Sequence, residues 1–298
     1  MAASSAWTDG WFWSLDGLRL HYRDYAGPAD RPVLLCLPGL TRSARDFANF
    51  AERHAGAWRV VVVDLRGRGE SSYAKDSLSY VPLTYLQDLH ALLSAARIER
   101  FVGIGTSLGG LLVMLMTATH REAIAGAVLN DVGPVVEPGG QARLRGNVGR
   151  GANWPTWMHA ARDLYEHNAA IYPDWTITDW LAFAKRLCRL TPTGRIVFDY
   201  DARIAEAFRL PGGDAGLDLW AGFDALAQVP VLSVRGELSD VLSADTQAAM
   251  AARHPGLHAV AVPRVGHAPT LDEPEAVAAV AALLEQVQKR AVANEDHP

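Results

Sequence analysis

The chain has 298 residues, of which 49% are hydrophobic and 20% are charged, and its formal net charge is −5. This balance is typical of a globular protein with a sizeable core and excludes a disordered chain. Lys and Arg are scattered, so we expect no nucleic-acid partner. No run of about 18 apolar residues is present, so we expect no membrane partner. The first ten residues do not resemble a signal peptide, and we therefore expect a cytoplasmic location.

The N-terminal third predicts a hairpin followed by strands that alternate with helices. Asp16-Gly17 separates two strand-like segments, 11–15 and 18–25, which favours an antiparallel hairpin. The next segments in chain order are a strand at 33–37, a helix at 43–55, a strand at 60–63 and a helix at 83–96. Both strands are continuous apolar runs, as expected of parallel strands buried on both faces. Cys36 lies in the first run, which favours a buried thiol over half of a disulfide.

The alternation continues further along the chain, with one interruption. It predicts a strand at 101–104, a helix at 111–119 and a strand at 127–129, and later a strand at 229–234, a helix at 244–252, a strand at 258–262 and a helix at 274–288. Between them the chain is rich in Trp, Arg and Gly, with helical patches but no convincing strand. We therefore predict an α/β core of residues 1–133 and 224–298, with a mostly parallel sheet between helices, and an inserted helical cap of residues 134–223.

The central motif is Gly105-Thr106-Ser107-Leu108-Gly109, which matches the pattern G-x-S-x-G. An apolar strand precedes it and an apolar helix follows it, so the chain must turn sharply at Ser107. Side chains two positions before and after the turn would collide, which explains the two glycines. Such a turn exposes the serine Oγ at the top of the sheet, and we predict Ser107 to be a nucleophile.

These features resemble a known family. The segments LCLPGLTRSARDF, VVVDLRGRGESS, IGTSLGGLL, SVRGELSDVLS and VGHAPTLDEPE are similar to those of cap-bearing α/β-hydrolases, a group that includes esterases, enol-lactonases and carbon–carbon hydrolases. The resemblance covers nearly the whole chain, although residues 134–223 resemble the family only in being an inserted helical segment. It implies the α/β-hydrolase fold and a serine hydrolase that needs neither a cofactor nor a metal.

A serine hydroxyl needs a base to take its proton, and the base needs an orienting acid. His267 follows the last predicted strand and is the predicted base. In this fold the acid lies between serine and histidine in the chain. Asp240, in the loop after the strand at 229–234, is the predicted acid. Asp131, at the end of the strand before the cap, is the rival because some relatives carry the acid there, and Glu237 is a more distant candidate.

The resemblance also assigns the two donors of an oxyanion hole. One is the backbone N–H of Leu108, directly after the serine. The other lies in the loop after the strand at 33–37, where many relatives have His-Gly and this chain has Pro38-Gly39-Leu40. The N–H of Leu40 is the natural second donor, since a backbone amide does not depend on the side chain before it.

An aromatic-rich cap would wall a largely apolar pocket for a small molecule. Trp154, Trp157 and Met158 are candidates for its lining, although they could equally form the cap's own core. Arg42 could meet a substrate carboxylate, but a solvated loop arginine is the simpler interpretation. Cap arginines such as Arg143 could select an anionic substrate, and nothing in the sequence decides between these possibilities.

The leading functional hypothesis is hydrolysis of a carboxylic ester or lactone through an acyl-enzyme. Carbon–carbon bond hydrolysis of a dienoate and cofactor-free haloperoxidase activity would use the same side chains. A small-molecule receptor on the same fold is the alternative of another class. Substrate identity and oligomeric state are not readable from the sequence.

Overall fold

The computed structural model describes residues 6–209 and 218–295, and its centre is an eight-stranded sheet. The strand order is β1-β2-β4-β3-β5-β6-β9-β10. The strands are β1 (Thr8–Trp13), β2 (Arg19–Tyr25), β3 (Val33–Leu37), β4 (Val60–Asp64), β5 (Phe101–Thr106), β6 (Ile124–Asn130), β9 (Val231–Gly236) and β10 (Leu257–Val262). β2 runs antiparallel to both of its neighbours, and the remaining pairs are parallel. The predicted hairpin and the predicted parallel sheet are both confirmed.

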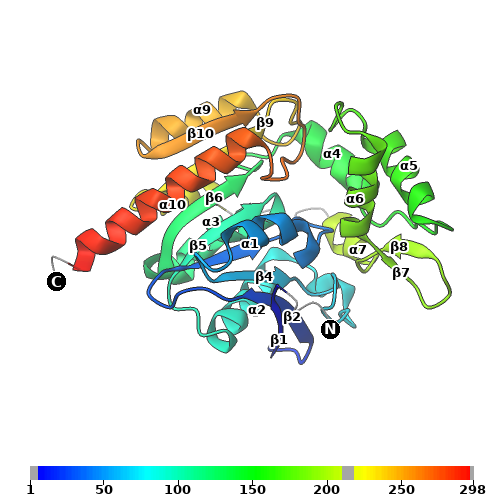
Figure 1. The fold of residues 1–298 in the computed structure, drawn as a ribbon, viewed down its shortest axis with the longest axis horizontal. Helices are drawn as coiled ribbons and strands as arrows, with labels where there is room; N and C mark the ends of the chain where they lie inside the picture. Colours follow the sequence, from blue (N-terminus) through cyan, green and yellow to red (C-terminus); the bar gives the residue numbers. More distant parts are fainter. Residues whose placement is uncertain (1–5, 210–217, 296–298) are drawn as a thin grey trace.

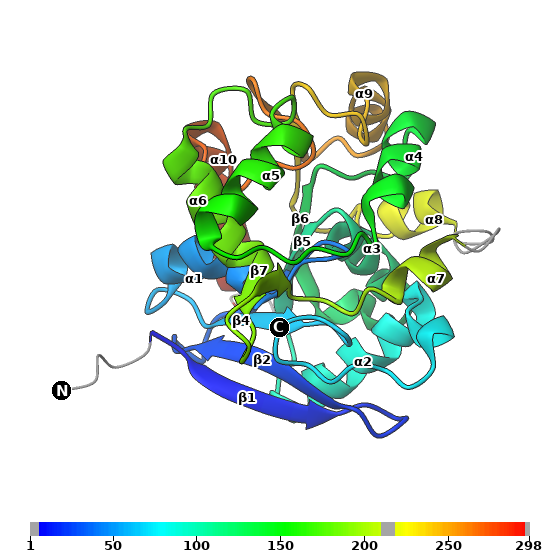
Figure 2. The same ribbon diagram turned by 90° about the vertical axis from the view of Figure 1, so that its right-hand side faces the viewer.

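Helices cover both faces of this sheet (Figure 1, Figure 2). They are η1 (Ala44–Phe47), α1 (Ala48–His54), η2 (Ser77–Ser79), α2 (Pro82–Ala95), α3 (Leu108–His120), η3 (Arg121–Ala123), α9 (Ala244–Arg253) and α10 (Pro274–Glu295). Alternate residues of each central strand enter two separate apolar layers. In β3, Leu35 and Leu37 join the layer with α2 and α3, whereas Leu34 and Cys36 join the layer with α1 and α10. Cys36 is a buried free thiol, as its apolar run favours.

The chain between β6 and β9 makes a long excursion to one end of the sheet (Figure 1). It comprises α4 (Pro138–Asn147), α5 (Trp157–Asn168), α6 (Ile177–Leu187), β7 (Cys188–Leu190), β8 (Ile196–Phe198), α7 (Ile204–Arg209) and α8 (Leu219–Asp224). The expectation of no strand in this stretch was wrong, because β7 and β8 form a short antiparallel pair. Residues 210–217, inside the predicted cap, lie outside the described residues. After them, α8 packs on α3 of the sheet layer (Figure 2).

Within residues 6–209 and 218–295, no helix combines the length and apolar character that a bilayer crossing requires. The longest helix, α10, packs instead on β10, β9 and β6. Its buried apolar side chains belong to the same layer as those of α1. These contacts explain why the helix is apolar along one face.

A buried histidine fastens the N-terminal hairpin to the rest of the sheet. The His21 ring is 1% exposed, and its Nδ1 and Nε2 lie 2.7 Å from Asp64 and 3.0 Å from Asp9. Burial lowers the pKa of His21, but the hydrogen bonds with Asp64 and Asp9 outweigh burial and raise the pKa above its usual 6.5. The imidazolium form is therefore favoured in the folded protein.

This arrangement predicts a loss of stability on the alkaline side. The contribution of His21 is fully present below the unfolded-state pKa and disappears as the pH rises through the higher folded-state pKa. We expect the free energy of unfolding from urea titrations to fall over this interval, starting near pH 6.5. The variant His21→Asn should lack that fall. If the variant shows a fall of equal size, another group is responsible for it.

Candidate active site

Ser107 occupies the sharp turn that the sequence predicts. It lies between β5 and α3, with φ 53° and ψ −117°. A Cβ on Gly105 would lie 2.4 Å from backbone atoms of Gly109, and a Cβ on Gly109 would lie 1.8 Å from the carbonyl oxygen of Leu37. No side chain can be accommodated at such distances, so only glycine fits at either position. The turn therefore exists because two close backbone approaches are permitted on both sides of the serine.

Three side chains from three different loops meet at this turn. The Oγ of Ser107 lies 2.9 Å from Nε2 of His267, and Nδ1 of His267 lies 2.7 Å from Oδ2 of Asp131. Asp131 directly follows β6, and His267 lies in the loop after β10. Because β5, β6, β9 and β10 are parallel, their carboxyl ends lie on the same edge of the sheet. The predicted pair of Ser107 and His267 is thus brought into direct contact.

Asp240 does not contact His267, and the predicted pairing of these two side chains was wrong. Its carboxylate instead accepts two hydrogen bonds from the guanidinium of Arg143 on α4, at 2.6 and 2.7 Å. These bonds, and the charge of Arg143, lower the pKa of Asp240. The helix lies so close to this loop that a Cβ on Gly140 would be 2.3 Å from the Asp240 carbonyl oxygen. A cation far away in the sequence therefore draws Asp240 away from the histidine.

Asp131 is held by the loop that was expected to supply the acid. It is fully buried, and its Oδ1 accepts a hydrogen bond from the N–H of Gly236 at 2.8 Å. Its Oδ2 accepts from the hydroxyl of Ser239 at 2.7 Å as well as from His267. The last residue of β9 and the loop after it thus contribute two donors that orient the carboxylate directly after β6. Glu237, the third candidate, accepts from the N–H of Arg264 instead.

Asn130 is a positioning residue that the sequence reasoning missed. Its side-chain amide donates to Thr106 Oγ1 at 3.0 Å and to the carbonyl oxygen of Pro269 at 2.8 Å. The backbone carbonyl oxygen of Asn130 accepts a hydrogen bond from the N–H of Ser107 at 3.0 Å. One residue therefore joins the serine turn to the histidine loop. The available signal was an amide side chain directly before Asp131 at the end of an apolar strand.

The loop after β3 lies beside the serine. A Cβ on Gly39 would be 3.8 Å from the Cβ of Ser107, so the two backbones are close neighbours. The carbonyl oxygen of Leu40 accepts a hydrogen bond from the fully buried guanidinium of Arg68 at 2.9 Å, which fixes the orientation of this loop. On the other side of Ser107, Leu108 is the first residue of α3, and N–H groups at this position have no acceptor within the helix.

A cavity of about 330 Å³ opens over Ser107 and His267. Of the four predicted substrate contacts, Arg42 and Trp154 line it, whereas Trp157 and Met158 do not. The part of α5 that faces the cavity is its second half, at Asp163, Leu164, His167 and Asn168, and the first two residues of the helix point elsewhere. Met158 is 37% exposed, and Trp157 packs against an apolar layer.

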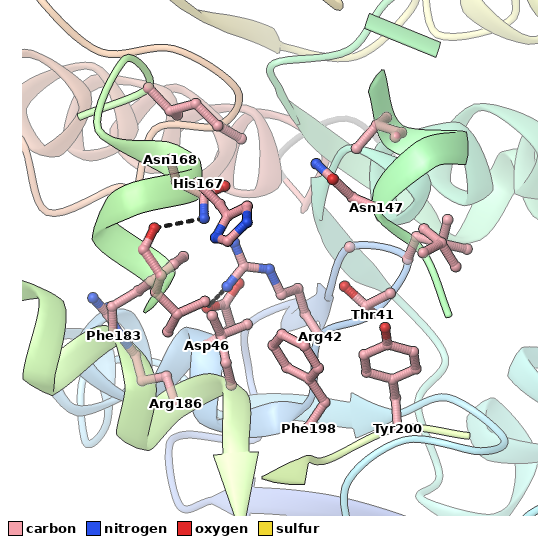
Figure 3. A pocket seen from close by; sticks show the side chains of 18 of the residues that line it. Thr41, Arg42, Asp46, Asn147, His167, Asn168, Phe183, Arg186, Phe198 and Tyr200 are labelled. Carbon is pink, nitrogen blue, oxygen red and sulfur yellow. Dashed lines mark hydrogen bonds and ion pairs between the residues drawn. The ribbon is translucent and has the colours of Figure 1, made fainter. Parts of the chain in front are cut away.

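The cavity wall is more polar than an aromatic-rich insert suggests. Its described lining includes six charged side chains, namely Arg42, Asp46, Arg143, Arg150, Asp163 and Arg186 (several are labelled in Figure 3). Tyr172 and Phe183 line the cavity, whereas their aromatic neighbours Trp175 and Trp180 do not. Tyr172, Trp175, Trp180 and Phe183 pack on one another, with Tyr172 and Trp175 stacked at 3.7 Å. Among the described residues, no group of three or more His, Cys, Asp or Glu side chains is arranged to hold a metal ion.

Comparison with known proteins identifies the family. The model of the alpha/beta hydrolase family matches residues 34–280. The chain belongs to this family. The hydrolase is 33% identical to a 3-hydroxybutyrate-oligomer hydrolase of Cupriavidus necator, over 87% of this chain and 90% of the relative. An alpha/beta hydrolase from Novosphingobium aromaticivorans of known structure is 57% identical, with a TM-score of 0.92 over 95% of this chain and 100% of the other.

A third similarity is more local. The hydrolase is 32% identical to N-formylmaleamate deformylase of Pseudomonas putida, over 43% of this chain and 47% of that protein.

In this hydrolase the segment between α5 and α6 supports the histidine loop. The hydroxyl of Tyr172 donates to the carbonyl oxygen of Ala268 at 2.7 Å, and the N–H of Gly266 donates to the carbonyl oxygen of Ile171, also at 2.7 Å. These two bonds lie on either side of His267. The excursion between β6 and β9 therefore does more than wall the cavity, because it also positions the ring that contacts Ser107.

Proposed function

We propose that this hydrolase cleaves carboxylic esters through an acyl-enzyme formed on Ser107. The single observation that carries the proposal is the 2.9 Å contact between Ser107 Oγ and His267 Nε2, at a turn that exposes the serine to the cavity. A nucleophile within hydrogen-bond reach of a base that is itself oriented by a carboxylate is the arrangement required for acyl transfer. Asp131, rather than Asp240, is the orienting carboxylate in this proposal.

The reaction proceeds in two halves. Ser107 Oγ attacks the ester carbonyl carbon while its proton passes to Nε2 of His267, and Nδ1–H of His267 donates to Asp131 throughout. The tetrahedral intermediate then expels the alcohol, whose oxygen receives the proton from Nε2. A water molecule next gives its proton to Nε2 and attacks the acyl-serine. The carboxylic acid leaves, and the proton returns to Ser107.

The tetrahedral intermediate carries a negative charge on the former carbonyl oxygen, and hydrogen-bond donors are needed to stabilise it. The N–H groups of Leu40 and Leu108 are the proposed pair, since they flank Ser107 from the loop after β3 and from the first residue of α3. The positive end of α3 adds to the stabilisation. Loss of one such donor in a related site lowers kcat by roughly 10²- to 10³-fold.

For the substrate class we propose short esters of hydroxy acids. The support comes from the Cupriavidus necator relative, whose name specifies 3-hydroxybutyrate oligomers and which aligns over 90% of its length. The cavity of about 330 Å³ is at the small end of the range for ligand pockets, which favours a short substrate over a polymer segment.

The proposal is tested by reaction with a fluorophosphonate, followed by peptide mass mapping. We expect one phosphonyl group on Ser107, formed by attack of Oγ on phosphorus with loss of fluoride. The label should be lost in Ser107→Ala and strongly reduced in His267→Ala. Turnover of p-nitrophenyl butyrate should follow the same order. A protein that binds such esters without Ser107-dependent turnover would instead be a receptor, and the proposal would be wrong.

A further inference from the structure

Two of the arginines that line the cavity have no strong partner in the described part of the chain. The cavity arginines are Arg42, Arg143, Arg150 and Arg186. Arg143 is neutralised by its two hydrogen bonds to Asp240. Arg150 donates to Nε2 of His167 at 3.0 Å. The other two guanidinium groups are poorly satisfied, although each carries five N–H donors.

Arg42 makes a single long contact. Its guanidinium lies 3.5 Å from Oδ1 of Asp46, at the limit of a hydrogen bond, and the side chain is 21% exposed. Figure 3 shows this side chain extending across the cavity. Its Cζ lies 4.6 Å from the ring centroid of Phe183, so the guanidinium rests on an aromatic surface. The remaining donors of Arg42 are available to a molecule in the cavity.

Arg186 lies against the same ring. Its Cζ is 5.9 Å from the centroid of Phe183, and its Nε is buried without a hydrogen-bond partner. No described residue accepts a hydrogen bond from this guanidinium, and Asp46, one of the two acidic residues of the lining, lies beside Arg42. The Nε is enclosed, so the terminal nitrogens of this guanidinium, which also form no hydrogen bond with a described residue, are the donors available in the cavity.

From these contacts we infer that Arg42 and Arg186 bind a carboxylate of the substrate beside Phe183. The inference rests on the proposed ester hydrolysis and adds a requirement for a negative charge. Two guanidinium groups outweigh the single charge of Asp46, and the other acidic residue of the lining, Asp163, lies 3.7 Å from His167 Nδ1, so the position beside Phe183 attracts an anion. A carboxylate matches the planar donor pairs of arginine, and the phenyl ring keeps water from the stacked faces.

The position of Arg42 links this charge to the chemistry. It lies two residues after Leu40, in the loop that flanks Ser107, whereas Arg186 comes from α6. A bound carboxylate would therefore join the loop to the helix and fix the ester relative to Ser107. Orientation of this kind raises kcat as well as lowering KM.

The test uses matched acid and amide substrates with the same scissile ester. One pair, 3-(butanoyloxy)butanoate and 3-(butanoyloxy)butanamide, carries the charge on the alcohol side. The second pair, the monoethyl ester of glutarate and its amide, carries the charge on the acyl side. We expect kcat/KM for the acid of at least one pair to exceed that of its amide by roughly 10- to 100-fold, the range of a charge-assisted hydrogen bond. The pair that responds identifies the side of the ester that carries the carboxylate.

The variants Arg42→Gln and Arg186→Gln should each remove most of this preference. Arg186→Gln is the cleaner of the two, since it breaks no hydrogen bond with a described residue and is distant in sequence from Leu40. Lys185→Gln is the matched control, because it removes the same charge from the neighbouring exposed position of α6. This control should keep the preference. Arg186→Lys should retain part of it, because the charge remains while the paired donors are lost.

Turnover of p-nitrophenyl butyrate separates the two possible failures. If the native protein does not hydrolyse this neutral ester or any of the four matched esters, the proposed function fails. If esters are hydrolysed but neither acid is preferred, or if the preference survives in both arginine variants, the carboxylate position is wrong. Equal loss in Lys185→Gln would also overturn it, because the effect would then be one of general charge. The far-UV circular dichroism spectrum and the thermal midpoint of each variant show that it is folded.

Discussion

Replacing Asp131 with asparagine should lower kcat for ester hydrolysis by about 10⁴-fold, as in serine hydrolases whose orienting aspartate is changed in this way. The reason lies in the existing contacts. Oδ1 accepts the N–H of Gly236, so the oxygen of the new amide would take that position. Its NH2 group would then face Nδ1 of His267 and favour the tautomer that carries its proton on Nε2. That tautomer cannot accept the proton of Ser107. The measurement is kcat at neutral pH with p-nitrophenyl butyrate.

Asp240→Asn is the matched control for this experiment. Asp240 is the other aspartate near the histidine, but its carboxylate is bonded to Arg143 and partly exposed. Because a partly exposed ion pair contributes less than about 1 kcal/mol, we expect kcat to fall by less than fivefold. A larger loss of kcat in Asp240→Asn than in Asp131→Asn would show that Asp240 is the acid and would contradict the hydrogen-bond arrangement at His267.

The variant Asp88→Ala should lower the free energy of unfolding by about 3 kcal/mol, because it leaves the buried guanidinium of Arg66 with only a half-exposed partner, Asp16. The guanidinium of Arg66 is 1% exposed and bonds both oxygens of Asp88 at 2.7 Å. Asp88 lies on α2, and Arg66 follows β4. The pair thus fastens a helix to the segment whose Arg68 orients the loop beside Ser107. The loss is measured by urea unfolding at neutral pH.

A second partner of the same guanidinium provides the control. Asp16 also bonds Arg66, at 2.9 and 3.0 Å, but its side chain is 51% exposed. Asp16→Ala should therefore cost about 1 kcal/mol or less. The double variant Arg66→Met with Asp88→Leu should recover much of the loss, since no charge remains buried. Equal effects of the two single aspartate variants would show that burial is not the cause.

The serine turn could be predicted because its causes lie within a few consecutive residues. Gly105 and Gly109 permit the close approaches, an apolar strand and an apolar helix set the direction, and Ser107 follows by position. His267 could be predicted because the order of elements brings the loop after the last strand to the same edge of the sheet. The differences within the core elements concern mainly their ends: the helix expected at 43–55 begins as η1 and continues as α1, the strand expected at 127–129 is longer, and the helix expected at 274–288 continues to Glu295.

The choice between two aspartates could not be made in the same way. Asp131 follows β6 and Asp240 lies in the loop after β9, and these two strands are neighbours in the sheet. Both carboxylates therefore reach the edge where His267 lies. What separates them is Arg143, which comes from α4 and lies 97 positions away from Asp240 along the chain. A local sequence pattern cannot indicate an ion-pair partner that is so far away along the chain.

The lining of the cavity was equally dependent on long-range packing. Trp157 and Met158 begin a helix whose second half faces the cavity, so their position on the helix, and not their apolar character, excludes them. Arg186 and Phe183 lie three residues apart on α6, and both line the cavity because this helix packs against α5 and η1. By itself, the sequence determined the fold class, the serine turn and the histidine, since local backbone sterics and strand order specify them. Only the tertiary structure decided the acid and the charge of the cavity, because both depend on which distant side chains meet.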